Sequence, residues 1–256
     1  MQYEGKRNNK AASGVIVVIG NEILSGRTQD KNINFIAARC DKIGIIIKEV
    51  RIIPDKKSVI VKTVLDLHKK FDYIFTTGGI GPTHDDITTE SIASAFKVKT
   101  ELNKEALSRL KRHYKKMGVD LNQARKKMAI IPFNSELIDN PVSAAPGFIL
   151  KNIYVFPGVP KILQAMFYEL EDKITGTKNI FSKTIIVHGA EGEIAIFLEE
   201  IQNQYSEVNI GSYPYFRPPD IGTNIVLRSL DKNIINNAML AIKSKLIENK
   251  IKFEEN

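Results

Sequence analysis

The sequence YIFTTGGIGPTHDDITTE, residues 73–90, joins a short apolar run to a glycine-rich segment and then to an acidic pair. The β-branched and aromatic residues of 73–77 predict a buried strand. Three glycines within the next four residues predict a loop whose backbone N–H groups can converge on an anion. An amphipathic pattern then predicts a helix from about residue 86 to 96. Strand, glycine loop and helix in this order indicate an α/β fold with a phosphate-binding loop at the carboxyl end of a strand.

The same step from strand to helix recurs on both sides of this stretch. Strands are predicted at 15–19 and 45–53, and the helices that follow them at about 28–43 and 56–70. Further on, the apolar segments 148–150 and 153–156 predict a hairpin, and the PGVP sequence at 157–160 precedes a predicted helix at 161–170. We therefore expect a domain at 14–175 with a mostly parallel sheet and helices on both faces.

A second, smaller domain is predicted at 180–256, after a short linker at 176–178. Its pattern is β-α-β-β-α, with strands at 183–188, near 208–212 and at 224–229, and with helices at 191–205 and 232–249. The polar and basic residues 1–13 show no apolar stretch after their charges, so we expect a disordered lead-in rather than a secretory signal.

Composition limits the class of protein. The 256 residues include one cysteine, Cys40, and their formal net charge is +8. A single cysteine excludes an intramolecular disulfide and favours a reducing compartment, so we expect a cytoplasmic protein, with Cys40 as a small buried apolar residue. No apolar run has the roughly 20 residues of a membrane span, and we expect no membrane partner. The charge would suit nucleic acid or an anionic metabolite, and the basic run at 109–116 could be a solvated helix face or a ligand contact.

The glycine loop supplies the first candidates for a binding site. We expect it to bind phosphate through the segment formed by Thr77, Gly78, Gly79, Gly81 and Pro82. The next acids, Asp85 and Asp86, could cap the following helix or coordinate a hard divalent cation. Glu90 would lie on the same helical face, four residues after Asp86.

Two more predicted strands end in loops with similar chemistry. The loop after 15–19 combines glycines with polar side chains, and the PGVP loop follows 153–156. Asp55 stands after the strand 45–53, where it could cap a helix or belong to the site. Candidate ligand-binding residues in the two loops are Gly20, Asn21, Glu22, Ser25, Gly26, Pro157, Gly158 and Pro160.

Together these motifs resemble the molybdopterin-binding (MoaB/Mog-like) domain family. The resemblance rests on GNEILSGRTQDKN, RIIPD, TTGGIGPTHDDITTE, NPVSAAPGF and FPGVPKILQAM, in that order, and is closest to the branch found in CinA and in eukaryotic FAD synthase. It adds Ser143, within NPVSAAPGF, to the candidate ligand-binding residues. The 180–256 segment, with its GSYP sequence at 211–214, is similar to the KH-like domain of that branch. Its G-x-x-G string at 189–192 follows a predicted strand rather than lying between two helices, so we do not expect a nucleic acid partner.

The resemblance implies one of two chemistries. Relatives in cofactor biosynthesis bind or adenylylate molybdopterin, with aspartates at positions that match Asp55 and Asp86. The CinA and FAD synthase branch implies a metal-dependent pyrophosphatase acting on ADP-ribose or FAD, and a non-catalytic nucleotide- or pterin-binding module is a third alternative. The doubled aspartate of GPTHDD and the second domain favour the pyrophosphatase. Asn21 departs from the aspartate that is common in the first loop of the family.

The predicted enzyme thus hydrolyses a nucleotide diphosphate with a divalent cation such as Mg, Mn or Co. We expect Asp85 and Asp86 to hold the cation, and Glu90 or Asp55 to orient or deprotonate the attacking water. The resemblance also implies a homo-oligomer whose ligand is a small nucleotide or pterin.

Overall fold

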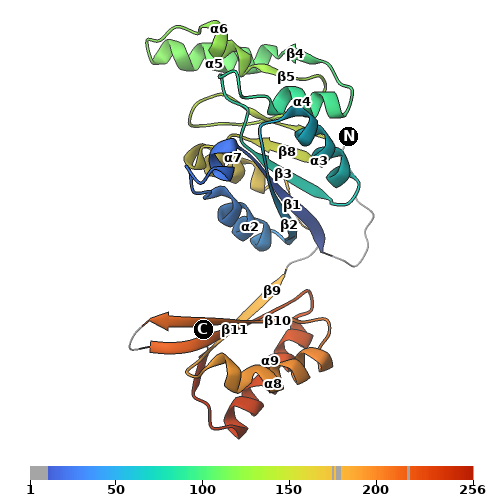
Figure 1. The fold of residues 1–256 in the computed structure, drawn as a ribbon, viewed down its shortest axis with the longest axis vertical. Coiled ribbons are helices and arrows are strands. Elements are labelled where there is room, and N and C mark those ends of the chain that lie inside the picture. The colour runs from blue at the N-terminus through green and yellow to red at the C-terminus, as the bar shows by residue number, and fades with distance from the viewer. Residues whose placement is uncertain (1–10, 175, 177–179, 218–219, 256) are drawn as a thin grey trace. The chain divides into compact units, whose positions relative to one another are not determined.

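The computed structural model describes residues 11–174, 176, 180–217 and 220–255. The chain divides into two compact units, Met1–Thr177 and Lys178–Asn256 (Figure 1). Most of the predicted lead-in and most of the predicted linker lie outside the described residues. The part of the lead-in that is described differs from the prediction, because the first strand already begins at Ala12.

A six-stranded sheet forms the centre of the first unit. Its order is β2-β1-β3-β8-β7-β6, and the first four of these strands are parallel to one another while β7 and β6 are antiparallel to their neighbours. The strands are β1 (Ala12–Ile19), β2 (Ile45–Ile53), β3 (Tyr73–Thr77), β6 (Glu136–Ile138), β7 (Gly147–Leu150) and β8 (Ile153–Phe156). The mostly parallel sheet predicted from the sequence is confirmed.

Helices cover both faces of this sheet because β1 is apolar on both sides. Val15 and Val17 belong to the core on the side of α3 (Lys57–His68) and α4 (Thr88–Ala95). Ile16 and Val18 belong to the core on the side of α2 (Asn32–Lys42) and α7 (Pro160–Glu171). A strand buried on both faces needs such a continuous apolar run.

Cys40 is a residue of α2, and it is fully buried in the core on the side of α2 and α7. Burial raises the pKa of its thiol to about 12, so the side chain stays a neutral thiol at physiological pH. The prediction of a small buried apolar residue is confirmed.

Several elements differ from the sequence-based expectation. The helix α2 begins at Asn32 instead of residue 28, and α4 begins at Thr88 instead of residue 86. The hairpin of β7 and β8 is confirmed, and Lys151 makes its turn with φ of 58°. A lobe drawn in green at one end of the first unit in Figure 1 packs against the core on the side of α3 and α4. Of this lobe only the basic run 109–116 was considered from the sequence, as a possible helix face. The elements of the lobe are β4 (Thr100–Leu102), α5 (Lys104–Lys116), α6 (Gln123–Lys127) and β5 (Ile130–Pro132).

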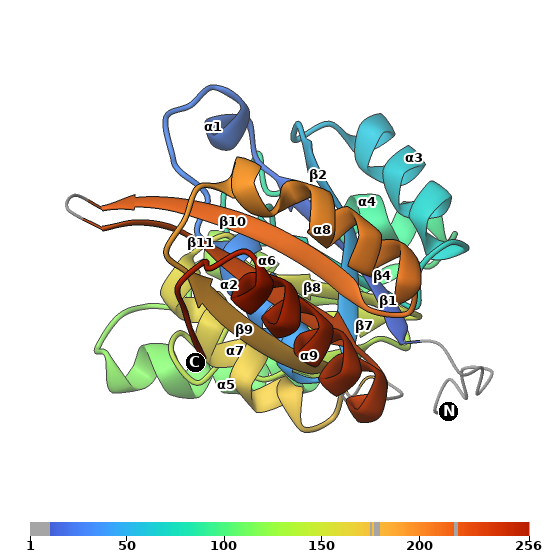
Figure 2. The ribbon, with the colours of Figure 1, turned by 90° about the horizontal axis from the view of Figure 1, so that it is seen from below.

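The second unit is a four-stranded antiparallel sheet of order β10-β11-β9-β12. Figure 2 shows its two helices next to each other on one face, where they enclose a separate apolar core. The elements are β9 (Phe181–Val187), α8 (Glu191–Gln204), β10 (Asn209–Arg217), β11 (Asp220–Ser229), α9 (Lys232–Glu248) and β12 (Phe253–Glu255). The β-α-β-β-α order is confirmed, and β12 is an additional strand. Within the described residues of both units, no helix is long and apolar enough to cross a membrane.

One buried side chain joins the carboxyl ends of the parallel strands. Asn32, at the start of α2, is 2% exposed. Its Nδ2 donates to Thr77 Oγ1 at 2.9 Å and to the carbonyl oxygen of Gly158 at 2.8 Å. Thr77 Oγ1 in turn donates to the carbonyl oxygen of Pro157 at 3.3 Å. Asn32 therefore ties α2, the end of β3 and the loop after β8 together.

Replacing Asn32 should destabilise this edge, because neither alanine nor aspartate can donate the two hydrogen bonds that Nδ2 makes. Asn32→Ala should lower the free energy of unfolding by about 1–3 kcal/mol, because the buried hydroxyl oxygen of Thr77 and the carbonyl oxygen of Gly158 lose their donor. Asn32→Asp should cost more, because it buries a carboxylate against two acceptor oxygens. Urea unfolding followed by far-ultraviolet circular dichroism measures both, since the chain has no tryptophan.

The matched control is Asn34→Asp, which makes the same chemical change at an exposed position of the same helix. Its effect should stay within about 0.5 kcal/mol. An Asn32→Asp variant as stable as this control would contradict the assigned role.

Candidate functional site

The candidate site lies at the edge of the sheet where four adjacent parallel strands end. Direct hydrogen bonds join the loops that leave these strands. The N–H of Gly20 donates to the carbonyl oxygen of Ile53 at 3.1 Å, and the N–H of Gly78 donates to that of Phe156 at 3.1 Å. The N–H of Asn21 donates to Asp55 Oδ2 at 2.8 Å. The loops after β1, β2, β3 and β8 thus form one continuous surface.

The glycine loop after β3 is held in a conformation that other residues would not adopt. Gly78 and Gly79 have φ of 103° and 69°. A Cβ on Gly78 would lie 2.1 Å from the carbonyl oxygen of Ile19, and one on Gly79 would lie 2.2 Å from Thr88 Oγ1. Thr88 fixes the loop, because its N–H donates to the Gly79 carbonyl oxygen and its hydroxyl donates to that of Gly78, each at 2.9 Å. The loop is therefore rigid before any ligand binds.

Three backbone donors of this loop remain available. The N–H groups of Gly79, Ile80 and Gly81 make no hydrogen bond to any described residue. All three residues are partly exposed. Consecutive free N–H groups in a glycine loop that precedes a helix are the arrangement that binds phosphate oxygens.

The acidic pair lies in a turn before α4, not on it. Thr83 closes this turn, because its N–H donates to Asp86 Oδ2 at 2.8 Å and its hydroxyl donates to the same oxygen. Ile87 is the N-cap residue, so neither acid caps α4. The prediction that Asp86 and Glu90 share one face of a helix is consequently wrong.

The carboxylate of Asp86 lies beside Gly81, whereas Asp85 is exposed to solvent. A Cβ on Gly81 would lie 2.6 Å from Asp86 Oδ2, so the glycine leaves room for that carboxylate. Asp85 is exposed, and hydrogen bonds from Thr83 and from its own backbone, with the charges of His84 and Lys127, lower its pKa. Asp85 is therefore ionised at neutral pH.

The other two predicted acids have partners of their own. Asp55 does not cap α3, because the N-cap residue of this helix is Lys56 and no side chain caps it. The carboxylate of Asp55 instead accepts a hydrogen bond from Asn21 and so holds the first loop. Glu90 forms an ion pair with Lys57 Nζ at 2.5 Å, which directs it toward α3.

Of the acids at this edge, Asp85 and Asp86 have the chemistry to bind a divalent cation together with a phosphate. The described residues contain no group of three or more His, Cys, Asp or Glu that could hold a metal ion by themselves. Mg²⁺ is commonly bound through one or two carboxylates together with the phosphates of a substrate. Asp85 and Asp86 fit that mode, because both are hard oxygen donors and the bonds from Thr83 use only Oδ2 of Asp86.

Sequence reasoning missed two residues at this edge. Lys127, the last residue of α6, donates from Nζ to the carbonyl oxygen of Asp86 at 2.9 Å and to that of Thr83. Lys127 comes from the lobe and lies 41 positions from Asp86 in the sequence. Nothing in the basic sequence around it distinguishes it from Lys126. Asn32 was part of a quoted motif, but its spacing gave no sign of a buried hydrogen-bond donor.

The remaining candidates lie at this edge of the sheet, except Ser143, which lies beside it. Ser25 donates to the Glu22 carbonyl oxygen at 3.3 Å, and Gly26 has φ of 71°, so both shape the first loop. Pro160 starts α7, as predicted. Ser143 lies one strand further along, in the loop 139–146, where its hydroxyl accepts from Asn140 Nδ2 at 2.8 Å. No hydrogen bond connects it to the glycine loops within the described residues.

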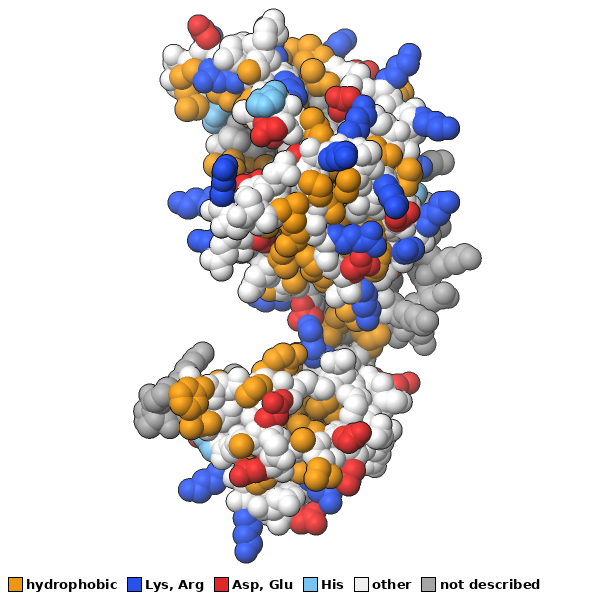
Figure 3. All heavy atoms as spheres, viewed as in Figure 1, with side chains coloured by type: hydrophobic (Ala, Val, Ile, Leu, Met, Phe, Trp, Pro, Cys, Tyr) orange, Lys and Arg blue, Asp and Glu red, His pale blue; other side chains and the backbone are white. Residues whose placement is uncertain are grey.

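The side of the first unit that Figure 3 shows does not carry one large basic patch. Lys and Arg side chains of the first unit are spread singly there, with acids and apolar groups between them. This distribution suits a small ligand better than a long polyanion.

Comparisons with known proteins agree with this architecture. Residues 15–175 match the model of a probable molybdopterin binding domain, and residues 179–255 match the middle domain of FAD synthase. An Archaeoglobus fulgidus protein is 34% identical over 201 residues, which cover 78% of this chain and 85% of that protein. The probable FAD synthase of Caenorhabditis briggsae is 30% identical over 259 residues, which cover 92% of this chain and 50% of its own length.

A solved structure supports the fold of the first unit. The CinA protein of Thermoplasma acidophilum, described as having unknown function, superimposes with a TM-score of 0.59 at 32% identity. The match covers 64% of this chain and 99% of that one. With its strand order, its glycine loop and a matched second segment, this chain belongs to the family of proteins with a molybdopterin-binding (MoaB/Mog-like) domain, in the branch that also carries the FAD synthase middle domain.

Proposed function

We propose that the first unit hydrolyses the diphosphate bond of a nucleotide such as FAD or ADP-ribose with the help of a divalent cation. One observation carries the proposal. The free N–H groups of Gly79, Ile80 and Gly81 lie next to the carboxylate of Asp86, and Lys127 holds the turn that carries Asp85 and Asp86. Hydrogen-bond donors for a phosphate and carboxylates for a cation thus occur within the same segment.

Each group has a role that its geometry supports. The free amides bind non-bridging phosphate oxygens and stabilise the charge that grows on them as the bond breaks. Asp85 and Asp86 would hold the cation, which when bound supplies charge neutralisation and a more acidic water. Lys127 keeps the turn of Asp85 and Asp86 in place through its bonds to two carbonyl oxygens.

Asp55 is the better of the two candidates for orienting the attacking water. It lies between the first two loops of the edge, where it accepts from Asn21. Glu90 is directed toward Lys57 on α3. Hydrolysis of FAD by this route yields FMN and AMP.

The resemblance to FAD synthase through both units supports a flavin or adenine nucleotide as the substrate. The described match of residues 15–175 to a probable molybdopterin binding domain supports the alternative, which is binding or adenylylation of molybdopterin. A screen separates the two. The protein is incubated with FAD, ADP-ribose and NADH, each with Mg²⁺, Mn²⁺ or Co²⁺, and the products are separated by chromatography.

We expect release of AMP from at least one of these substrates, and only with a metal. Parallel incubation with ATP and molybdopterin tests the alternative through release of pyrophosphate. Adenylylated pterin without hydrolysis of any dinucleotide would replace the proposal by adenylyl transfer.

Removing the charge of Asp86 should abolish most of the turnover. Asp86→Asn keeps an oxygen that can accept from Thr83 but removes a cation ligand, so kcat should fall by about a hundredfold or more. Asp66→Asn, an exposed carboxylate on α3, is the matched control and should turn over normally. Normal turnover by the Asp86 variant would place the site elsewhere.

Replacing Lys127 should lower kcat/KM of the same reaction although this residue belongs to the lobe. Lys127→Met removes a charged hydrogen-bond donor worth about 1.5–3 kcal/mol, so kcat/KM should fall by roughly ten- to a hundredfold. Lys126→Met changes the neighbouring lysine of α6 and should have little effect. Equal activity of the two variants would show that Lys127 does not support the site.

A further inference from the structure

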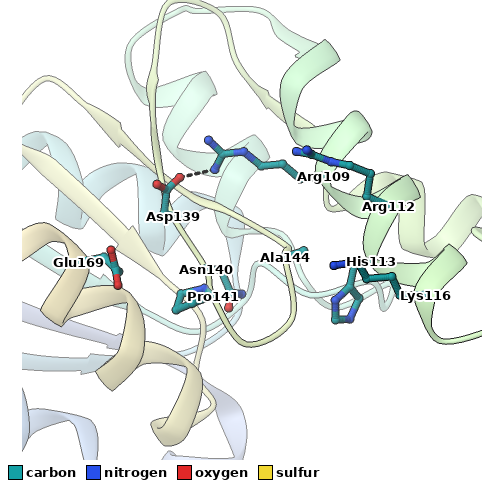
Figure 4. A pocket seen from close by; sticks show the side chains of 9 residues that line it. All are labelled: Arg109, Arg112, His113, Lys116, Asp139, Asn140, Pro141, Ala144 and Glu169. Atoms are coloured by element: carbon teal, nitrogen blue, oxygen red, sulfur yellow. Dashed lines mark hydrogen bonds and ion pairs between the residues drawn. The ribbon is translucent and has the colours of Figure 1, made fainter.

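A second concave surface lies away from the glycine loops, beside α5. Four side chains of this helix line it, namely Arg109, Arg112, His113 and Lys116, and all four belong to the basic run 109–116 that could be a solvated helix face or a ligand contact. Their spacing of three and four residues places them on one face of the helix. The groove has a volume of about 440 Å³ (Figure 4). That volume lies within the range of small-molecule sites.

The opposite wall combines a rigid loop with two carboxylates. Asp139 and Asn140 come from the loop 139–146, and Glu169 comes from α7. Asn140 fixes the loop, because its Oδ1 accepts from the N–H groups of Val142 and Ser143 at 3.0 Å. The wall is therefore formed before a ligand arrives, which reduces the entropy lost on binding.

The three Lys and Arg side chains of α5 that line the groove divide into one that is paired and two that are not. Arg109 forms ion pairs with Glu105, at 2.5 Å, and with Asp139, as the dashed line in Figure 4 shows. The side chains of Arg112 and Lys116 form no ion pair or hydrogen bond with any residue that the structure describes. In Figure 4 they lie with His113 on the side of the groove away from Glu169. The groove is thus positive along α5 and negative at its far side.

We propose that this groove binds a small phosphorylated metabolite of about the size of a mononucleotide. Arg112 and Lys116 bind its phosphate, and Glu169 accepts a hydrogen bond from a hydroxyl or amino group at the other end. A long nucleic acid strand fits less well, because its next phosphates would approach Glu169. The proposal goes beyond hydrolysis at the glycine loops and needs neither the metal nor turnover.

The chain contains a matched control for its test. Lys111 and Lys115 are exposed on the same helix, and neither lines the groove. Arg112→Gln with Lys116→Gln and Lys111→Gln with Lys115→Gln remove the same charge from the same helix. Circular dichroism checks that both double variants fold.

The experiment measures binding of AMP to the full chain in the presence of a metal chelator. Calorimetry gives the affinity, and the ring resonance of His113, assigned with His113→Gln, reports on the groove itself. Adenosine without the phosphate serves as the second ligand.

We expect AMP to move the His113 resonance in the wild-type chain and in the Lys111/Lys115 variant with the same Kd. The Arg112/Lys116 variant should bind AMP at least tenfold more weakly in the titration of that resonance, and adenosine should leave the resonance unmoved. An unmoved His113 resonance with AMP, or equal Kd values for the two double variants, would overturn the proposal.

Discussion

The architecture of the candidate site depends on how closely the end of β3 approaches the end of β1. At Gly78 a Cβ atom would lie 2.1 Å from the carbonyl oxygen of Ile19, far inside van der Waals contact. Only glycine allows the chain to leave β3 at this point with φ of 103°. Because the chain turns there, the carbonyl oxygens of Gly78 and Gly79 meet Thr88, and the next N–H groups are left free to face a ligand.

This constraint connects loops that are far apart in the sequence. Asn32 holds Thr77 and Gly158 beside the turn, and Asp55 holds the first loop at Asn21. The contacts of Asn32 use a buried amide, and the contact of Asp55 uses the backbone N–H of Asn21 as its donor, so neither depends on the type of side chain at position 21. Preorganised donors of this kind stabilise developing charge without having to reorient.

The sequence predicted the fold well because periodicity and strand chemistry are local. The strands at 45–53 and 73–77 begin and end where the apolar β-branched runs do. The start of α4 was wrong because Thr83 and Asp86 close a turn that competes with the first helical turn, and no pattern of hydropathy encodes that bond. Short strands such as β6 and β12 contain three residues each, too few to show a period. Lys127 was missed because its partners are carbonyl oxygens, which carry no sequence signal.

The same reasoning applies to Asn21, at the position where the resemblance of the sequence led us to expect aspartate. The contact that holds this loop is made by the backbone N–H of Asn21, which donates to Asp55, and its side chain is exposed. The loop conformation is thus independent of the side chain at this position. An asparagine in place of the expected aspartate therefore alters the charge of the loop and leaves that backbone contact in place.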